Sequence, residues 1–184
     1  LGEWYKRQLW YNPQTMPKLA NKLAAEYGKI QPNNKQYFKQ NAKKYIDSLK
    51  PVDNAIAKLR VQAEKEKTKN VFVSEPVFDY ALKAVGFKVA DHTFEEDTEN
   101  GVDPAPSSIA AMQNAIKQRK IAFFVYNKQV DSKTVNNFVA LAKQNNIPVL
   151  AVTETLPKGQ NYKSWMLNQY SELSNILTKD ENIK

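Results

Sequence analysis

The stretch Val71-Phe-Val-Ser-Glu-Pro-Val-Phe-Asp-Tyr80 combines a strand pattern with the start of a helix. Three apolar, strand-favouring residues lead into Ser74 and Glu75, and such a short apolar run is typical of a buried parallel strand. Pro76 then opens a segment with apolar residues at helical spacing, because proline suits the first turn of a helix. Glu75 is therefore predicted at the carboxyl end of a strand, where open α/β sheets present ligand groups.

Two later stretches repeat this arrangement. Residues 121–125 form an apolar run before Tyr126, and residues 148–152 form another shortly before Glu154. A weaker strand is predicted over residues 87–90. Helical patterns separate these runs, and this alternation predicts a parallel sheet with right-handed crossovers. The predicted fold class is α/β, with a parallel four-stranded sheet flanked by helices.

Residues 1–70 are predicted to be mostly helical. An amphipathic helix is predicted over residues 16–27, with Thr15 as its N-cap and Gly28 as its stop. A longer apolar stripe follows, and its roughly thirty residues correspond to about 40 Å of helix. Pro51 falls inside this stripe and is predicted to kink the helix or mark a joint, so two shorter helices remain possible.

Two segments are predicted to be irregular. Residues 1–15 are expected to dock on another surface, because they carry several large aromatic side chains: Trp4, Tyr5, Trp10 and Tyr11. Residues 91–106 are predicted to form a long loop, and such loops tend to be functional or mobile. We interpret its acidic residues as a solvated face and His92 as exposed, because the segment lacks the ligand spacing of a calcium loop.

The composition excludes several classes of protein. Hydrophobic residues make up 42% of the 184 residues, which indicates a globular chain, and no apolar run approaches the roughly 20 residues that span a bilayer. The absence of cysteine excludes disulfides and thiolate metal sites. No phosphate-binding glycine motif is present, which argues against a nucleotide-dependent enzyme, and the spacing suggests no catalytic Ser/His pair. The chain starts at Leu1 without an initiating Met, and we interpret it as a fragment or a processed piece.

Positive charge is concentrated in residues 1–70, which carry 15 Lys and Arg against 6 Asp and Glu, whereas residues 71–184 carry 12 against 13. This imbalance is compatible with an anionic partner such as nucleic acid, and salt-dependent binding to DNA would support that hypothesis. We favour a lysine-rich helix surface and no nucleic-acid partner. The aromatic residues of this region fit helical stripes and not a platform for stacking bases.

Glu75 and Glu154 are the strongest candidates for a binding site. Two carboxylates that converge from neighbouring strand ends can provide part of a site for a hard or borderline cation. Glutamates at strand ends are also common as helix caps or surface residues. Periodicity alone therefore does not decide whether Glu75 and Glu154 bind a metal ion.

A resemblance to a known family adds to this interpretation. Six motifs follow one another along the chain: Gln8-Leu-Trp-Tyr-Asn-Pro13, Glu75-Pro-Val-Phe-Asp-Tyr80, Asn100-Gly-Val-Asp-Pro-Ala-Pro106, Val125-Tyr-Asn-Lys-Gln129, Glu154-Thr-Leu-Pro157 and Tyr162-Lys-Ser-Trp-Met-Leu167. Their order and spacing resemble the solute-binding proteins of zinc and manganese ABC importers, in a Gram-positive branch, over nearly the whole chain.

The resemblance implies two α/β lobes joined by one long helix, with the metal held between them. Residues 1–32 would then be a remnant of the amino-terminal lobe, residues 33–69 the long linking helix and residues 70–184 the carboxyl-terminal lobe. The implied function is that of an extracellular substrate-binding component, not an enzyme, which delivers a zinc or manganese ion to an ABC transporter permease. A monomer, anchored at the cell surface by a lipid outside this chain, is expected.

The resemblance also places four metal-ligand positions on Gln8, Glu75, Tyr126 and Glu154. The family's usual ligands are two histidines and two carboxylates, so Glu154 keeps its chemistry and Glu75 replaces a histidine by an oxygen ligand. Gln8 could offer a carbonyl oxygen, whereas Tyr126 is a poor ligand unless deprotonated. With fewer nitrogen donors the site leans towards manganese or loses its metal. The alternative is a surface-binding or scaffold module of the same fold that has lost metal transport.

Overall fold

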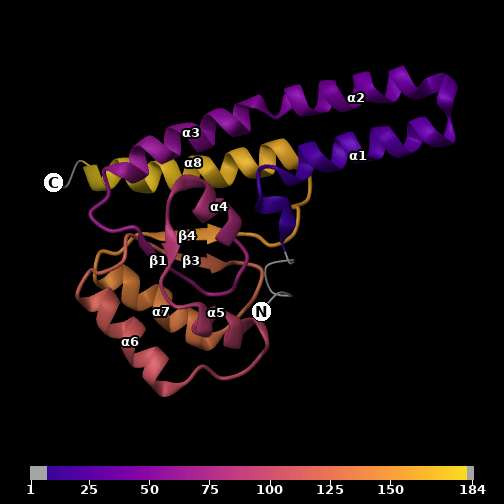
Figure 1. The fold of residues 1–184 in the computed structure, drawn as a ribbon. Helices are drawn as coiled ribbons and strands as arrows, with labels where there is room; N and C mark the ends of the chain where they lie inside the picture. The colour runs from indigo at the N-terminus through magenta and orange to yellow at the C-terminus, as the bar shows by residue number, and fades with distance from the viewer. Residues whose placement is uncertain (1–7, 182–184) are drawn as a thin grey trace.

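The strands and helices form three layers, with one parallel sheet between two layers of helices (Figure 1). The computed structural model describes residues 8–181. The sheet has the order β2-β1-β3-β4, and every pair of neighbours is parallel. The strands are β1 (Asn70–Val73), β2 (Lys88–Val89), β3 (Phe124–Asn127) and β4 (Val149–Val152). The predicted fold class is thus confirmed.

The helices account for most of the remaining described residues. In chain order they are α1 (Thr15–Ile30), α2 (Lys35–Ser48), α3 (Lys50–Glu64), α4 (Asp79–Val85), α5 (His92–Glu99), α6 (Pro106–Lys117), α7 (Lys133–Gln144) and α8 (Tyr162–Glu181), with short 3-10 turns η2 (Leu9–Tyr11) and η3 (Pro32–Asn34). None of the helices within residues 8–181 is long and apolar enough to cross a membrane.

Alternation along the strands explains why both faces of the sheet are covered. Successive side chains of a strand point to opposite faces. Val71 and Val73 belong to a buried cluster with residues of α3, α4 and α8, whereas Phe72 belongs to a second cluster with residues of α5, α6 and α7. Strands β1, β3 and β4 therefore contribute apolar side chains to both cores.

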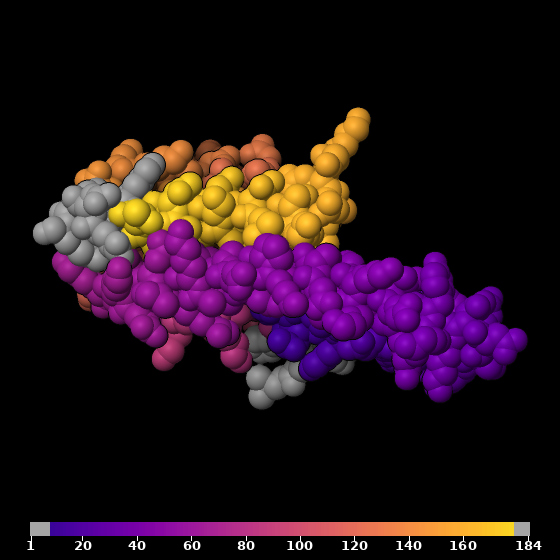
Figure 2. Space-filling view, turned by 90° about the horizontal axis from the view of Figure 1, so that it is seen from above, coloured from indigo at the N-terminus to yellow at the C-terminus, as the bar shows by residue number. Residues whose placement is uncertain are grey.

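Helices α1 and α2 form a hairpin that extends beyond the rest of the molecule (Figures 1 and 2). The sequence predicts that Gly28 ends α1, but in the structure Gly28 lies inside this helix. A Cβ at Gly28 would lie 3.0 Å from Cγ of Lys35, so glycine allows the two helices to approach closely. Thr15 is also not the N-cap, because Gln14 holds that position without a side-chain hydrogen bond.

The long helical stripe is divided at Leu49 into α2 and α3, and the joint predicted at Pro51 is confirmed. Pro51 lies in the first turn of α3, where its missing N–H leaves no hydrogen bond unmade. Helix α3 ends at Glu64 and packs along α8. Gln62 joins the two helices, because its Nε2 donates to Oγ1 of Thr178 at 2.9 Å.

The segment 91–106 contains a helix, α5, where the sequence suggested a loop. The carboxylate of Asp91 caps this helix by accepting a 3.0 Å hydrogen bond from the N–H of Phe94. Phe94 is fully buried and packs edge to face on Phe138, with ring centroids 5.3 Å apart. His92 is exposed, as expected, but Glu95 is 1% exposed, so this acidic segment is not simply a solvated face.

Candidate metal site at the carboxyl edge of the sheet

Three neighbouring strands end in polar residues at one edge of the sheet. Val73 of β1 pairs with Val125 of β3, so the register brings Glu75 opposite Asn127 two residues further on. Asn127 in turn pairs with Val152 of β4, shortly before Glu154. Glu75, Asn127 and Glu154 therefore come from strand ends that lie next to one another.

The carboxylate of Glu75 is buried and held by Asn127. The side-chain Nδ2 of Asn127 donates to Oε2 of Glu75 at 3.0 Å, and both residues are buried. The Asn127 side chain is itself fixed, because its Oδ1 accepts from the N–H of Gln129 at 3.0 Å. The N–H of Asn127 donates to Oγ of Ser74 at 3.1 Å, which ties the two strand ends together.

The electrostatic environment disfavours a bare charge on Glu75. Burial raises the pKa of the Glu75 carboxyl, the hydrogen bond from Asn127 opposes this shift, and repulsion from Glu99 and Glu154 adds to it. A nearby cation would reverse the repulsive contributions by stabilising the ionised carboxylates. The surroundings of Glu75 thus suit a carboxylate that is neutralised by a bound ion.

Glu154 contacts Gln8, which lies 146 residues earlier in the chain. Nε2 of Gln8 donates to Oε1 of Glu154 at 3.1 Å. Gln8 is 2% exposed and has a left-handed backbone with φ of 53°. Its Oε1 is buried and has no hydrogen-bond partner within the described residues. This carbonyl oxygen is available as a third oxygen donor beside two carboxylates.

A buried network fixes the position of Glu154 through its neighbour Thr153. The backbone N–H of Thr153 donates to Oε1 of Gln169 at 3.0 Å, and its carbonyl accepts from the hydroxyl of Tyr11. Nε1 of Trp165 donates to Oγ1 of Thr153 at 2.7 Å. The ring of Tyr11 packs edge to face on Phe78 and Trp165. The predicted docking of the aromatic segment thus involves Tyr11, whereas Trp4 and Tyr5 lie outside the described residues.

The Tyr126 side chain contacts the core on the face of the sheet covered by α5, α6 and α7. It is half-buried and packs on the cluster that contains Phe72 and Phe124. The side chain of β3 that reaches Glu75 is that of Asn127. Strand parity could have identified it, because Glu75 and Val73 share a face, as do Asn127 and Val125.

The fold and the site together define a class of protein, an α/β lobe that presents buried oxygen donors at the carboxyl edge of a parallel sheet. The family "zinc-uptake complex component A, periplasmic" (ZnuA) matches residues 6–176. The chain belongs to this family.

Curated relatives with similar sequences are metal transport proteins. The manganese ABC transporter substrate-binding lipoprotein PsaA of Streptococcus pneumoniae is 26% identical over 178 residues, which cover 92% of this chain and 55% of the relative. The high-affinity zinc uptake system protein ZnuA of Bacillus subtilis is 26% identical over 156 residues, or 84% of this chain and 46% of the relative. The chain thus spans about half the length of these relatives.

Solved structures share the fold. The laminin-binding adhesin Lmb of Streptococcus agalactiae has a TM-score of 0.66 at 19% identity, over 93% of this chain and 61% of its own. The periplasmic zinc-binding protein TroA of Treponema pallidum has a TM-score of 0.68 at 14% identity, over 92% of this chain and 63% of its own. At sequence identities this low, the similarity shows a common fold and does not show what this chain binds.

Proposed function

We propose that the chain is part of the extracellular substrate-binding component of a divalent-metal ABC importer. Residues 1–32 would end the amino-terminal lobe, and residues 70–184 would form the carboxyl-terminal lobe. Residues 33–69 would link the lobes through two helices, α2 and α3, in place of the single long helix expected from the sequence. The protein would hold the ion between its lobes, deliver it to a membrane permease and catalyse no reaction. The observation that carries this proposal is the hydrogen bond that Nε2 of Gln8 donates to Glu154, a carboxylate whose charge also acts on the buried Glu75. The carbonyl oxygen of Gln8 is left without a partner among the described residues.

The donor set favours manganese over zinc as the transported ion. Gln8, Glu75 and Glu154 offer oxygen atoms alone, and hard oxygen ligands suit manganese, whereas zinc prefers sites with nitrogen or sulfur. Asn127 would act from outside the ligand set by orienting Glu75 through its 3.0 Å hydrogen bond. Tyr126, which packs on the opposite face, would have to turn its side chain to reach the ion.

A second candidate function is a surface-binding module of the same fold without metal transport. It is supported by the hydrogen bonds that already engage both carboxylates, from Asn127 to Glu75 and from Gln8 to Glu154. One of the structures with this fold carries the description of a bifunctional protein with adhesin and metal transporting activity. The two candidates differ in whether a cation binds at the carboxyl edge.

Thermal unfolding with and without metal separates the two candidates. The chain would be melted in EDTA and then with manganese or zinc. An ion at a hundred times its dissociation constant adds about 2.7 kcal/mol to the free energy of unfolding. For a domain of this size that corresponds to a rise in Tm of about 5 to 10 °C. We expect this rise with manganese.

Matched variants assign the rise to the site. Glu75→Gln combined with Glu154→Gln removes both charges while keeping the side-chain volumes, and it should abolish the rise. Glu64→Gln combined with Glu172→Gln removes two exposed charges from α3 and α8 and should keep it. No rise with either metal would contradict metal binding at the carboxyl edge and favour the module without metal transport.

A further inference from the structure

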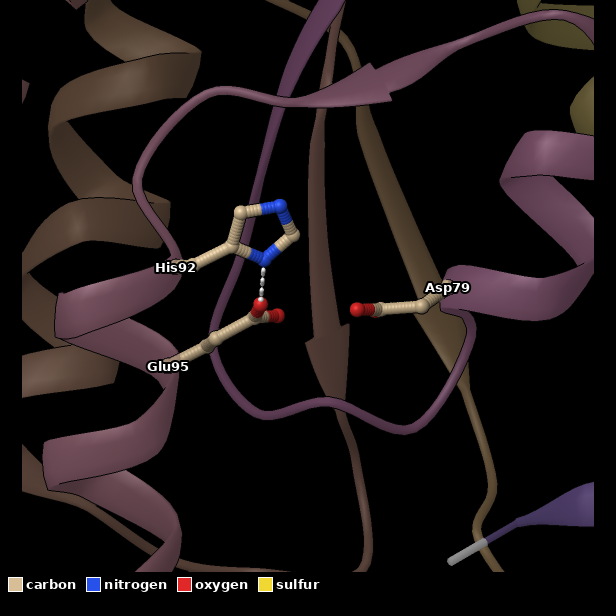
Figure 3. Close-up of side chains that lie close together, drawn as sticks. All are labelled: Asp79, His92 and Glu95. Atoms are coloured by element: carbon tan, nitrogen blue, oxygen red, sulfur yellow. Dashed lines mark hydrogen bonds and ion pairs between the residues drawn. The ribbon is translucent and has the colours of Figure 1, made fainter. Parts of the chain in front are cut away.

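A second group of metal-ligating side chains lies outside the site described above. Figure 3 shows Asp79 at the start of α4 facing His92 and Glu95 on α5. One potential ligand atom from each of these residues lies within 4.8 Å of the other two. His92 and Glu95 are three residues apart on one helix, a spacing that places them on the same face. The group therefore brings together two carboxylates and an imidazole from two helices.

One oxygen of each carboxyl group, in Asp79 and in Glu95, is buried without a hydrogen-bond donor among the described residues. The side chain of Glu95 is 2% exposed, and its Oε2 has no partner within the described residues. Oδ1 of Asp79 is also buried and without a partner there. Oε1 of Glu95 contacts Nδ1 of His92. Buried polar atoms in native proteins nearly always have a partner, so two unpartnered carboxylate oxygens that face one another need a proton or a cation between them.

The charges around this pair favour a positive ligand. Burial raises the pKa of both carboxyls, and repulsion from Asp79 raises the pKa of Glu95 further. Asp91 and Glu96 act on Glu95 in the same direction. Four acidic side chains thus lie close together at the start of α5: Asp79, Asp91, Glu95 and Glu96. A protonated imidazole of His92 would offset only part of their negative charge. A divalent cation would neutralise two of them at once.

The imidazole of His92 favours a metal ion over a proton shared between the carboxyls of Asp79 and Glu95. Its side chain is 51% exposed, so it opens the buried pair to solvent and provides an entry path for an ion. A neutral imidazole nitrogen and two carboxylate oxygens are ligands that zinc accepts, with a fourth position left for water. Calcium and magnesium prefer sites made of oxygen alone.

We propose that Asp79, His92 and Glu95 form a second, structural site for a divalent transition-metal ion, with zinc bound more tightly than manganese. The order follows from the general rise in affinity from manganese to zinc at mixed nitrogen and oxygen sites. The ion would fasten α5 to the start of α4. Glu99 at the end of α5 acts electrostatically on Glu75, so the second ion would also steady one wall of the candidate transport site.

The single histidine of the sequence makes this proposal directly testable. The ¹⁵N-labelled chain, produced without a histidine tag, would be titrated with zinc near neutral pH. Two-bond proton–nitrogen correlations then report on the imidazole of His92 alone, whatever binds at Glu75 and Glu154. We expect one ring nitrogen to shift and to saturate when zinc becomes equimolar with the chain. Manganese should displace zinc only at a large excess.

Matched variants show whether all three residues take part. Asp79→Asn and Glu95→Gln should each abolish the saturable shift, whereas Glu96→Gln removes a neighbouring charge on the same helix and should keep it. The double variant Glu75→Gln, Glu154→Gln should also keep it, so failure of the proposed transport site leaves this result unchanged. Circular dichroism checks the fold of each variant, and Asp79→Asn carries the test if Glu95→Gln does not fold.

Two outcomes would overturn the proposal. An imidazole spectrum that excess zinc leaves unchanged would mean that a shared proton, not a metal ion, lies between Asp79 and Glu95. A shift that persists in both carboxylate variants would mean that His92 binds zinc by itself from solution. In either case the cluster would be a structural carboxyl pair and not a metal site.

Discussion

The side chain of Gln169 on α8 donates a hydrogen bond of 2.8 Å to the hydroxyl of Tyr11. This contact joins the last helix to the segment that precedes α1. The same hydroxyl contacts the backbone carbonyl of Thr153, so three distant parts of the chain meet at one oxygen atom. Gln8 and Glu154 flank this point, and their relative position depends on it.

Replacing Tyr11 by phenylalanine should destabilise the protein without changing its core volume. The change leaves the buried carbonyl of Thr153 and the amide of Gln169 without their partner, which costs about 1–3 kcal/mol. Urea unfolding would measure the loss. Tyr37→Phe, at a side chain that is 61% exposed, should change the free energy of unfolding by less than about 0.5 kcal/mol. Equal stability of the two variants would contradict the role assigned to the Tyr11 hydroxyl.

Asn127→Asp tests the environment of Glu75. The variant replaces an amide donor by a second carboxylate beside a buried one, so we expect lower stability in EDTA and a larger rise in Tm with manganese than in the parent chain. Thermal unfolding at one pH would measure both effects. Asn137→Asp places the same charge on the exposed side of α7 and should show neither effect. A variant as stable as the parent in EDTA would argue against close contact with an ionised Glu75.

Gln8→His should raise the affinity for zinc relative to manganese. Histidine supplies a nitrogen ligand beside Glu154, and it tolerates the left-handed backbone of Gln8 better than most residues do. Isothermal titration with each metal would give the ratio of dissociation constants. Gln14→His adds a histidine at an exposed position near by and serves as the control. The same zinc-to-manganese ratio in both variants would place Gln8 outside the ligand set.

Stability should fall at alkaline pH through the buried tyrosines. The hydroxyl of Tyr162 donates to the carbonyl of Trp10 at 2.7 Å, and burial raises its pKa to about 12, with smaller contributions from Tyr45 and Asp53. An unfolded tyrosine ionises near pH 10, so the unfolded state loses its proton first. The free energy of unfolding is therefore unaffected below about pH 10 and decreases between about pH 10 and 12.

Tyr162→Phe isolates this contribution. The variant loses the hydrogen bond, which costs about 0.5–1.5 kcal/mol at neutral pH. Above about pH 10 its stability should fall less steeply, by up to about 1.4 kcal/mol per pH unit for one ionising group. Part of the slope should remain, because burial also raises the pKa of Tyr11 and Tyr170. Identical slopes for parent and variant in urea unfolding would contradict the assignment.

Much of the sheet could be predicted from the sequence because each strand is a short apolar run before a polar residue. The apolar run predicts that β3 starts at Ile121, three residues before its observed start at Phe124. Ala122 does contribute a 2.8 Å hydrogen bond to the carbonyl of Asn70, so hydrogen bonding to the β1 region starts before the regular strand. Apolar patterning therefore marks where a buried strand lies better than where its ladder begins.

The helices were harder to predict where tertiary packing overrides local signals. Gly28 lies inside α1 because close approach to Lys35 on α2 compensates for the poor helix propensity of glycine. The sequence pattern does not predict helix α5, because Phe94 is its single fully buried apolar residue and one such residue makes no amphipathic pattern. The sequence did carry one signal of this helix, the N-cap residue Asp91.

The candidate metal-site residues were also predictable only in part from the sequence. The contact of Gln8 with Glu154 spans 146 residues and cannot follow from local patterns, although the family resemblance placed both residues at one site. The resemblance also gave Tyr126, whereas the structure brings Asn127 to Glu75. The group of Asp79, His92 and Glu95 depends on α5, so treating that segment as a loop concealed it.

The joint at Leu49 is a point about which the α1–α2 hairpin could rotate relative to α3. Leu49 is 5% exposed, so its side chain packs where the hairpin leaves the body of the molecule. The 14 residues of α2 extend about 21 Å from this joint. A rotation of about 10° at Leu49 would therefore displace the far end of α2 by about 4 Å, given the rise of 1.5 Å per residue. Small changes in packing beneath this one leucine are amplified at the tip of the hairpin.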